Sequence, residues 1–387
     1  MALTTVSSDR LSTNVKNTNF TAAEKQDLTD DILPLAGQLG NRNLIINGAM
    51  QVAQRGTSDS GITSSEYADG PDRYKLGGSS FGTVTVSQST DSPNDFGNSY
   101  KVDVTTANGS LSAGSLLEIQ QSLEGQDVQD FAKGTSDAKQ YALSFHVKST
   151  KNGTYVVMLL DHDNNRMCCK TYTVSDANWN KYTLIFPADT TGAFDNDNAK
   201  SFSVKFQLVA GTTFTSGSLQ TTWGAAANAN SRVGQVNFAD STSNEWYLTG
   251  VQLEVGSVAT DFEHLSFADE LLKCQRYFQI FAAPNGEFTR FGLAASLASN
   301  SVRIPIPHIT EMRSKASFSY IGGNGDYQLP GSSNGFNISQ VIYESNTSST
   351  RSTCLQNGYV SVTTYNCYQF SANGQSNNAA LLFSAEL

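Results

Sequence analysis

Charged residues are scarce in this 387-residue chain, and no apolar run approaches the length of a membrane-spanning helix. Charged side chains make up 16% of the sequence, whereas a typical globular chain has about a quarter. Basic residues are in the minority, with 25 Lys and Arg against 35 Asp and Glu, and this balance would repel a phosphate backbone. We therefore expect neither insertion into a membrane nor binding to nucleic acid.

Paired cysteines are missing as well. The five cysteines lack the Cys-x-x-Cys spacing that binds zinc and stand at Cys168, Cys169, Cys274, Cys354 and Cys367. The first residues lack the basic and apolar regions of a secretory signal, so we expect synthesis in a reducing cytoplasm. Free, buried thiols are the expected state, and a bridge between Cys354 and Cys367 across a hairpin is the alternative.

The chain is instead rich in Ser, Thr, Asn and Gly and contains 21 Phe and 15 Tyr, a mixture typical of β-strands joined by polar turns. Between Asn43 and Gly256 apolar and polar residues alternate, as in Tyr141–Lys148, where the odd positions are large and apolar. The predicted strands are Phe81–Gln88, Lys101–Thr105, Leu116–Leu123, Tyr141–Lys148, Tyr155–Leu160, Met167–Val174, Lys181–Phe186, Phe202–Val209 and Trp246–Val255.

Many antiparallel strands without intervening helices predict an all-β fold, with a jelly-roll-like β-sandwich over residues 41–265. Apolar residues with helical spacing predict a connecting helix over 266–282. Residues 283–387 are predicted to form a second, distal β-rich domain. Its expected strands are Phe291–Leu297, Ser301–Ile306, Ala316–Ile321, Ile338–Tyr343, Gly358–Thr364 and Ala379–Leu387.

Residues 1–40 differ from the rest because they are polar and show no strand pattern. Thr21 and Glu24 form a capping-box pattern that opens a predicted helix towards Pro34. This composition suits both a disordered leader and a segment that folds when it docks on a partner, and the two alternatives stay open. We expect a partly helical N-terminal anchor.

Catalytic and metal-binding patterns are weak. Gly78–Gly82 and Gly331–Gly335 match a Gly-x-Ser-x-Gly elbow but lack the strand and helix that should flank the serine. Asp161–Asn165 begins like a calcium loop, yet Arg166 stands where the loop requires Gly and Tyr172 where it requires Glu. We expect a hairpin turn there, with a weak structural calcium as the alternative, and no catalytic residue, metal site or cofactor.

Five motifs stand out from the strand pattern. They are Asn43–Gly56, Asp72–Tyr74, Tyr247–Gly256, Thr260–His264 and Glu270–Phe278. With these motifs, residues 41–281 resemble the tail-fibre or receptor-binding class of virion structural proteins from tailed phages of aquatic bacteria, cyanophage-like phages among them. The resemblance implies a β-sandwich module carried on the particle.

The resemblance further implies a non-enzymatic protein of the virion tail that is made in the host cytoplasm. Residues 1–40 would attach to other tail proteins of the adaptor or nozzle kind, and the distal β domain would contact a host surface polysaccharide. Fibres of this class are homotrimers, which cover edge strands and multiply weak glycan contacts. The alternatives are a polysaccharide-degrading depolymerase of the tail and a purely architectural capsid or neck fibre.

Aromatic residues in polar surroundings are the candidate receptor contacts, because a ring stacks on a sugar while neighbouring amides bond its hydroxyls. The candidates are Trp223, Tyr320, Tyr327, Phe336 and Tyr343. Trp223, in a polar loop, is expected to be exposed, and for the four distal residues packing in the distal core or at a trimer axis is the alternative. Trp179 and Trp246 lie beside strand patterns, so we expect them to pack in the core or at a sheet edge.

Overall fold

The structure is a computed structural model that describes residues 41–283, 289–299, 301–322, 326–329, 336–338, 341–343, 348–357, 362–373 and 379–387. Residues 44–387 form one compact unit. The predicted anchor over residues 1–40 lies outside the described residues. Strands dominate the described ranges, which confirms the all-β class.

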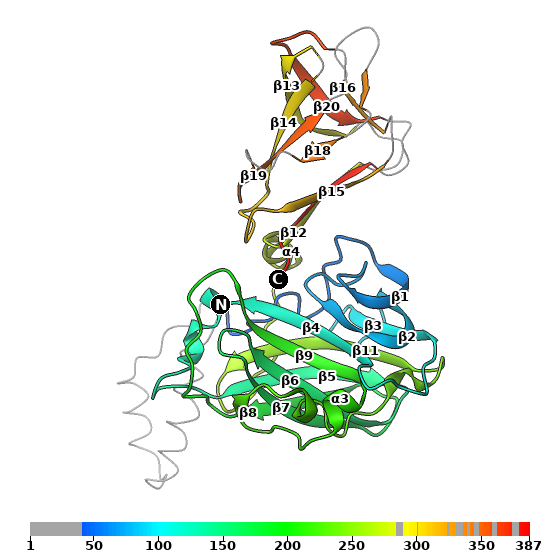
Figure 1. Cartoon of the computed structure of the whole chain (residues 1–387), viewed down its shortest axis with the longest axis vertical. Coiled ribbons are helices and arrows are strands. Elements are labelled where there is room, and N and C mark those ends of the chain that lie inside the picture. Colours follow the sequence, from blue (N-terminus) through cyan, green and yellow to red (C-terminus); the bar gives the residue numbers. More distant parts are fainter. Residues whose placement is uncertain are drawn as a thin grey trace. The chain divides into compact units, whose positions relative to one another are not determined.

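An 11-stranded antiparallel sheet forms the sandwich, with the order β10-β7-β6-β9-β4-β2-β3-β11-β5-β8 and with β1 paired to β2 (Figure 1). The strands are β1 (Ser58–Glu66), β2 (Lys75–Ser89), β3 (Ser99–Thr106), β4 (Leu116–Glu124), β5 (Tyr141–Ser149), β6 (Gly153–Asp161), β7 (Arg166–Val174), β8 (Asn180–Phe186), β9 (Lys200–Ala210), β10 (Gly224–Ala225) and β11 (Glu245–Val255). A short helix, α3 (Thr212–Thr215), follows β9. The strands predicted for this region are confirmed, and β1 and β10 are additional to them.

Strand β2 passes from one layer of the sandwich to the other. Its first part, Lys75–Ser79, pairs with β4, and its second part, Thr83–Ser89, pairs with β3. The first layer therefore contains β10, β7, β6, β9, β4 and the start of β2, and the second layer contains the end of β2 with β3, β11, β5 and β8. Glycine is required at this corner, because Gly78 has a φ of +123° and a Cβ there would lie 1.9 Å from the carbonyl oxygen of Leu116.

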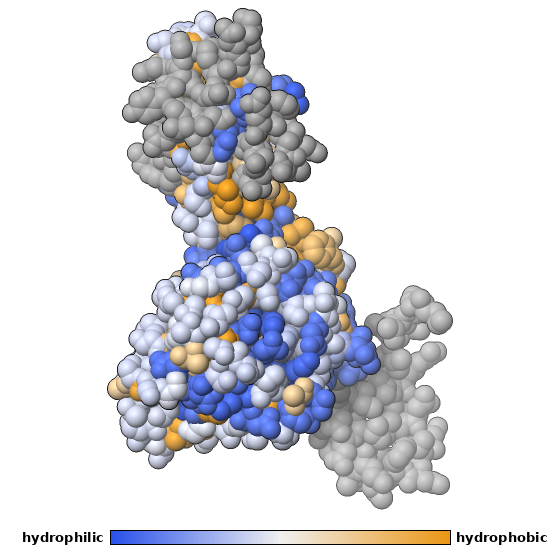
Figure 2. All heavy atoms as spheres, turned by 90° about the vertical axis from the view of Figure 1, so that its right-hand side faces the viewer, coloured by the Kyte–Doolittle hydropathy of each residue, from blue (hydrophilic) through white to orange (hydrophobic). Residues whose placement is uncertain are grey.

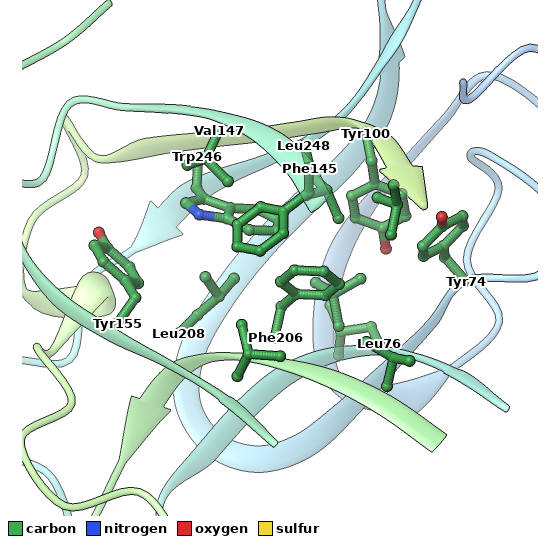
Figure 3. Packing of buried hydrophobic residues seen from close by; sticks show 14 of the residues in the cluster. Tyr74, Leu76, Tyr100, Phe145, Val147, Tyr155, Phe206, Leu208, Trp246 and Leu248 are labelled. Atoms are coloured by element: carbon green, nitrogen blue, oxygen red, sulfur yellow. The ribbon is translucent and has the colours of Figure 1, made fainter. Parts of the chain in front are cut away.

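Aromatic side chains from the two layers meet in the core (Figure 3). Phe145 and Trp246 of the second layer face Phe206 of the first, and the rings of Phe145 and Phe206 lie 5.0 Å apart in an edge-to-face arrangement. Trp246 is fully buried, as its strand pattern predicts. On the viewed side in Figure 2 the sandwich surface is mainly hydrophilic, with scattered apolar residues.

Residues 283–385 enclose a second hydrophobic core, separate from that of the sandwich. One sheet has the order β12-β21-β15 and the other β17-β16-β20-β13-β14-β19-β18. The strands are β12 (Phe278–Ala282), β13 (Arg290–Ala298), β14 (Ser301–Pro307), β15 (Ser317–Ile321), β16 (Tyr327–Leu329), β17 (Phe336–Ile338), β18 (Ile342–Tyr343), β19 (Ser352–Asn357), β20 (Cys367–Ala372) and β21 (Ala380–Ser384). The second β-rich region is therefore present.

The strand predictions for this second region are only partly confirmed. β13, β14, β15 and β21 match predicted strands, whereas β16, β19 and β20 are additional. Of the predicted strand Gly358–Thr364, residues 362–364 are described and are not in a strand. The predicted strand Ile338–Tyr343 is replaced by the end of β17 and by β18, and the residues between them include some outside the described ranges.

Helix α4 (Phe267–Gln275) is shorter than the predicted connecting helix. Its start is fixed by Ser266, whose Oγ accepts a hydrogen bond from the Asp269 backbone N–H. The prediction was wrong beyond the helix end, because Phe278–Ala282 forms β12 and pairs with β21. No helix in the described ranges is long and apolar enough to span a bilayer.

Arg73, from one of the five sequence motifs, is buried where the sandwich meets the segment after α4. Its guanidinium forms an ion pair with Glu386 and donates to the carbonyl oxygen of Ser122 at 2.8 Å. The guanidinium also stacks 3.4 Å from the centroid of the Tyr277 ring. Arg55 adds a second ion pair to Glu386 at 3.0 Å, so the two guanidinium groups share one nearly buried carboxylate.

Two other motifs, Asn43–Gly56 and Glu270–Phe278, contribute further contacts to this junction. Arg276 binds both carboxylate oxygens of Glu124 at 2.7 Å, and the Tyr277 hydroxyl donates to the same carboxylate at 2.6 Å. The backbone N–H of Asn47 donates to Glu270 of α4 at 2.6 Å. The motif residues therefore join the sandwich to α4 and β12.

Replacing Arg73 by Met is expected to lower the free energy of unfolding by about 3–5 kcal/mol, because a buried carboxylate loses one of its two cations. Urea denaturation of the full chain measures this loss. The control is Lys151→Met, which removes a partly exposed ion pair with Asp240 and should cost about 1 kcal/mol or less. Equal losses in the two variants would contradict a special role for the buried pair.

Candidate functional site

A row of side chains crosses the outer face of the second layer. Tyr247 of β11 pairs with Lys101 of β3 on one side and with Lys148 of β5 on the other. Neighbouring residues Trp246 and Leu248 belong to the core. Because side chains alternate along a strand and cross-strand partners share a face, Tyr247 and both lysines point outward.

The two ammonium groups lie beside the Tyr247 ring, 5.5 Å from its centroid for Lys101 and 5.3 Å for Lys148. Lys101 Nζ is 2.7 Å from Glu245 Oε1, and Lys148 Nζ is 2.6 Å from Asp91 Oδ2. The Tyr247 hydroxyl donates to Glu245 Oε2 at 2.8 Å. Burial and the Glu245 hydrogen bond raise the pKa of Tyr247 to about 12, so the hydroxyl keeps its proton at neutral pH.

Trp179 completes this arrangement at the start of β8. Its indole Nε1 donates to Asp91 Oδ1 at 2.9 Å, and its ring lies 6.0 Å from the Tyr247 ring, edge to face. Trp179 is half-buried, so part of the indole reaches solvent. We call Lys101, Lys148, Trp179 and Tyr247 the aromatic platform.

The platform combines an apolar ring surface with fixed hydrogen-bonding groups. The indole of Trp179 offers the apolar surface, and the charged side chains around Tyr247 offer donors and acceptors held by their ion pairs. Two cations face two carboxylates, so the local charge is balanced. This combination suits a neutral ligand that has both an apolar face and hydroxyl groups, as a pyranose ring does.

The end of β11 beyond Gly250 is covered by a following segment. Glu254 accepts hydrogen bonds from the backbone N–H and the hydroxyl of Thr260, at 2.8 and 2.7 Å. Gln252 Oε1 accepts one from the backbone N–H of Glu263 at 2.8 Å. The polar residues of this motif therefore hold the segment in place, and the platform lies on the part of β11 that precedes them.

Trp223 is partly buried, although the sequence predicts an exposed loop residue. Its indole Nε1 donates to the carbonyl oxygen of Pro187 at 2.8 Å. Its ring packs 5.7 Å from Tyr141 and 6.3 Å from Phe202, against the sandwich core. Trp179 has a similar intermediate exposure and packs on Tyr247 beside β8, the last strand of the sheet, which agrees with the predicted packing at a sheet edge.

The remaining predicted contacts lie in the second β region. Tyr327 is 1% exposed, and its hydroxyl lies 2.6 and 2.9 Å from two backbone carbonyl oxygens that can accept its proton. Tyr320 is 37% exposed and lies edge to face with Tyr327. Phe336 lies in β17 and Tyr343 in β18, while their side chains are outside what the structure describes. Tyr320 is thus the surface residue among those described here, and Tyr327 is a core residue.

The calcium-like turn at Asp161–Asn165 joins β6 to β7, and a lysine takes the place of a metal ion. The buried Lys133 Nζ lies 2.6 Å from Asp161 Oδ2 and 3.2 Å from Asp189 Oδ2. It also donates to the carbonyl oxygens of Thr191 and Gly192 at 2.8 and 2.5 Å. This set of carboxylate and carbonyl oxygens is of the kind that binds calcium, and the ammonium satisfies it.

Groups for metal or nucleophilic chemistry are not assembled in the described ranges. Among those residues no three or more His, Cys, Asp and Glu side chains are placed to hold a metal ion. Gly78–Gly82 lies within β2 rather than at a strand-to-helix turn, and Gly331–Gly335 lies outside the described residues. The five cysteines are free thiols.

No protein-family model matches the chain, and no curated protein matches it. Among solved structures it is similar to the C-terminal family 22 carbohydrate-binding module of Clostridium thermocellum Xyn10B, at 12% identity over 57% of this chain and 99% of that one, with a TM-score of 0.29. The family 11 module of the C. thermocellum cellulase Lic26A-Cel5E gives 13% identity, 52% and 99% coverage and a TM-score of 0.26. A Bacteroides thetaiotaomicron protein described as a putative sugar-binding protein is similar at 12% identity over 55% of this chain and 100% of that one, with a TM-score of 0.28. Similarity at this level carries no argument about function.

The hydrogen bond between Trp179 and Asp91 is expected to persist in acid. Burial alone would raise the pKa of Asp91, but hydrogen bonds from Lys148 and Trp179 outweigh it and hold the pKa below its usual 3.8. A carboxyl with a depressed folded-state pKa stabilises the fold above its unfolded-state pKa, and this contribution is lost as the pH falls through the folded-state pKa. The indole N–H shift of Trp179 in NMR spectra should therefore titrate with a midpoint below 3.8.

Trp223 is the internal control for that titration, because its indole donates to a backbone carbonyl that does not ionise. Its N–H signal should stay constant while that of Trp179 moves. A Trp179 midpoint at or above 3.8 would contradict the expected shift of Asp91.

Two substitutions of Lys133 test its role as an internal cation. Lys133→Ala and Lys133→Met should each lower the free energy of unfolding by about 3–5 kcal/mol, because the buried Asp161 loses its cation while Asp189 keeps Arg166. Millimolar calcium should restore part of this stability in the Ala variant, where space is left for the ion, but not in the Met variant, whose side chain fills it. Thermal unfolding with and without calcium chloride distinguishes them, and an identical calcium response would contradict the assignment.

Proposed function

We propose that the protein is a non-enzymatic adhesin, a tail-fibre protein of a tailed phage that binds a glycan on the host cell surface. The aromatic platform is the observation that carries the glycan-binding part of the proposal. The resemblance of the five motifs supports the virion part. Because the platform lies on the sandwich, the proposal moves the main contact from the distal β region to the second layer.

A sugar ring would lie with its apolar C–H face on the exposed part of the Trp179 indole. Its hydroxyl groups would then meet Lys148 and Asp91 on one side and Lys101 and Glu245 on the other. These four side chains are already held in ion pairs, so little conformational entropy is lost when a ligand binds. The balanced charge favours a neutral sugar at this position.

The wider assembly belongs to the same proposal. A homotrimer would present three platforms and raise the apparent affinity through multivalency. Residues 1–40 would attach the protein to other proteins of the phage tail, and the protein would act on the virion.

Deleting residues 1–40 should abolish incorporation into particles and leave residues 44–387 folded, because these form a compact unit of their own. An aggregating deletion variant would contradict the anchor role.

Replacing Trp179 by Ala should weaken binding to extracted host polysaccharide roughly tenfold, which corresponds to the loss of about 1.4 kcal/mol. Isothermal titration calorimetry measures the affinity, and light scattering of the same sample reports the oligomeric state. Tyr365→Ala is the matched control, because Tyr365 is 85% exposed in the other β region and should leave the affinity unchanged.

The outcomes separate the competing functions. Saturable binding that Trp179→Ala weakens, without release of sugar fragments, supports the adhesin. Release of reducing sugar would assign the protein to the depolymerase class instead. No binding by the unaltered protein would leave an architectural fibre as the better explanation, and an equal loss in Tyr365→Ala would remove the platform from the proposal.

A further inference from the structure

A second row of polar side chains crosses the outer face of the first layer. Lys75 of β2 pairs with Gln120 of β4, and Gln120 pairs with Lys205 of β9. On each strand a directly adjacent residue belongs to the core. Because side chains alternate along a strand, these three side chains share the outer face. Lys200 pairs with Glu124 across a bulge and lies on the same face. We call Lys75, Lys200, Lys205 and Gln120 the basic row.

Cations outnumber carboxylates around the basic row. Glu118 is shared by Lys205 at 2.7 Å and Arg232 at 2.6 Å. Burial alone would raise the pKa of Glu118, but these two cations lower it to about 2. No carboxylate of the described residues lies within 4.0 Å of the ammonium of Lys75 or Lys200. The chain as a whole carries a formal charge of -10, so this local excess runs against its average.

His162 lies in the field of the basic row. Its Nε2 is 2.8 Å from the hydroxyl of Ser203, the residue of β9 next to Lys205 on this face. Burial, and then the charges of Lys200 and Lys205, lower the pKa of His162 to about 4. Burial and the charges of Lys205 and Lys75 also lower the pKa of Lys200. The ammonium groups therefore repel one another, and an anion between them would relieve the repulsion.

Neutral donors accompany the charges. No hydrogen bond joins the side chain of Gln120 to the described residues, so its amide is available to a ligand. Beside it on β2 stands Gly77, where a Cβ would lie 3.0 Å from Glu118 and 3.5 Å from the Gln120 amide nitrogen, so these two side chains lie over the glycine.

We propose that the basic row is an anion-binding site that takes an oxyanion group, a carboxylate or a sulfate. Lys75 and Lys200 would supply charge-assisted hydrogen bonds, and Gln120 would donate from its amide. The bearer of the group is either an acidic polysaccharide or a free anion, which present the same chemistry. The site lies on the opposite layer from the aromatic platform and does not rest on the glycan proposal made for that platform.

The experiment titrates the full-length protein at low ionic strength with inorganic sulfate and, separately, with a galacturonate oligosaccharide. NMR spectra of the His162 imidazole provide the readout. Bound anion cancels part of the positive field, so the pKa of His162 should rise from about 4 in proportion to occupancy. In Lys75→Gln/Lys200→Gln the pKa should be higher without any anion and should no longer respond to either probe.

The control variant is Lys139→Gln/Lys181→Gln, which makes the same change in net charge at two exposed lysines before β5 and in β8. It should keep the sulfate response of His162. Tighter binding of the oligosaccharide than of sulfate would identify an acidic polysaccharide as the bearer, and equal binding would identify a free anion. A His162 pKa that neither probe moves in the unaltered protein, or a response lost equally in both double variants, would overturn the proposal.

Discussion

The buried guanidinium of Arg73 is the interaction on which the rest of the structure depends. It meets Glu386 from the end of the chain, the carbonyl oxygen of Ser122 in the first layer and the ring of Tyr277 after α4. A charge taken out of water is stable only with all its partners in place. Three segments that are far apart in sequence therefore fold as one assembly. Residues of three of the sequence motifs, with Asn47, Arg73 and Tyr277 among them, make contacts at this junction, so they have a structural role.

Strands that bury one face were predictable from the sequence, because the core imposes alternation on them. Tyr141–Ser149 shows this clearly, and its strand was predicted almost to its ends. In β1 only Ile62 is buried, so the strand carries no such pattern. The end of helix α4 was predicted wrongly for a different reason. Phe278–Ala282 has helical spacing, but β21 offers a strand partner from far along the chain, and pairing with it outweighs the local preference.

The aromatic platform could not be predicted because its members come from separate segments whose register the sequence does not contain. Tyr247 meets Lys101 and Lys148 only through two specific strand pairings. Trp179 precedes a strand, and its position alone does not say which face it occupies. The same limit explains Trp223 and Tyr327, since a polar stretch around an aromatic residue does not reveal whether the ring turns inward. The sequence thus singled out aromatic residues, and the strand register decides which of them lie together on one face.

The ammonium of Lys133 has a consequence for where such a sandwich can work. A fold stabilised by a bound divalent ion depends on the concentration of that ion in its surroundings, and it loosens when a chelator removes it. Here the neutralising charges, Lys133 with Arg166, are part of the chain and cannot diffuse away. The buried oxygens of Asp161 and Asp189 are therefore compensated at any calcium activity. The geometry of the sandwich should then be the same in fresh water, in brine and against an acidic polymer that sequesters divalent ions.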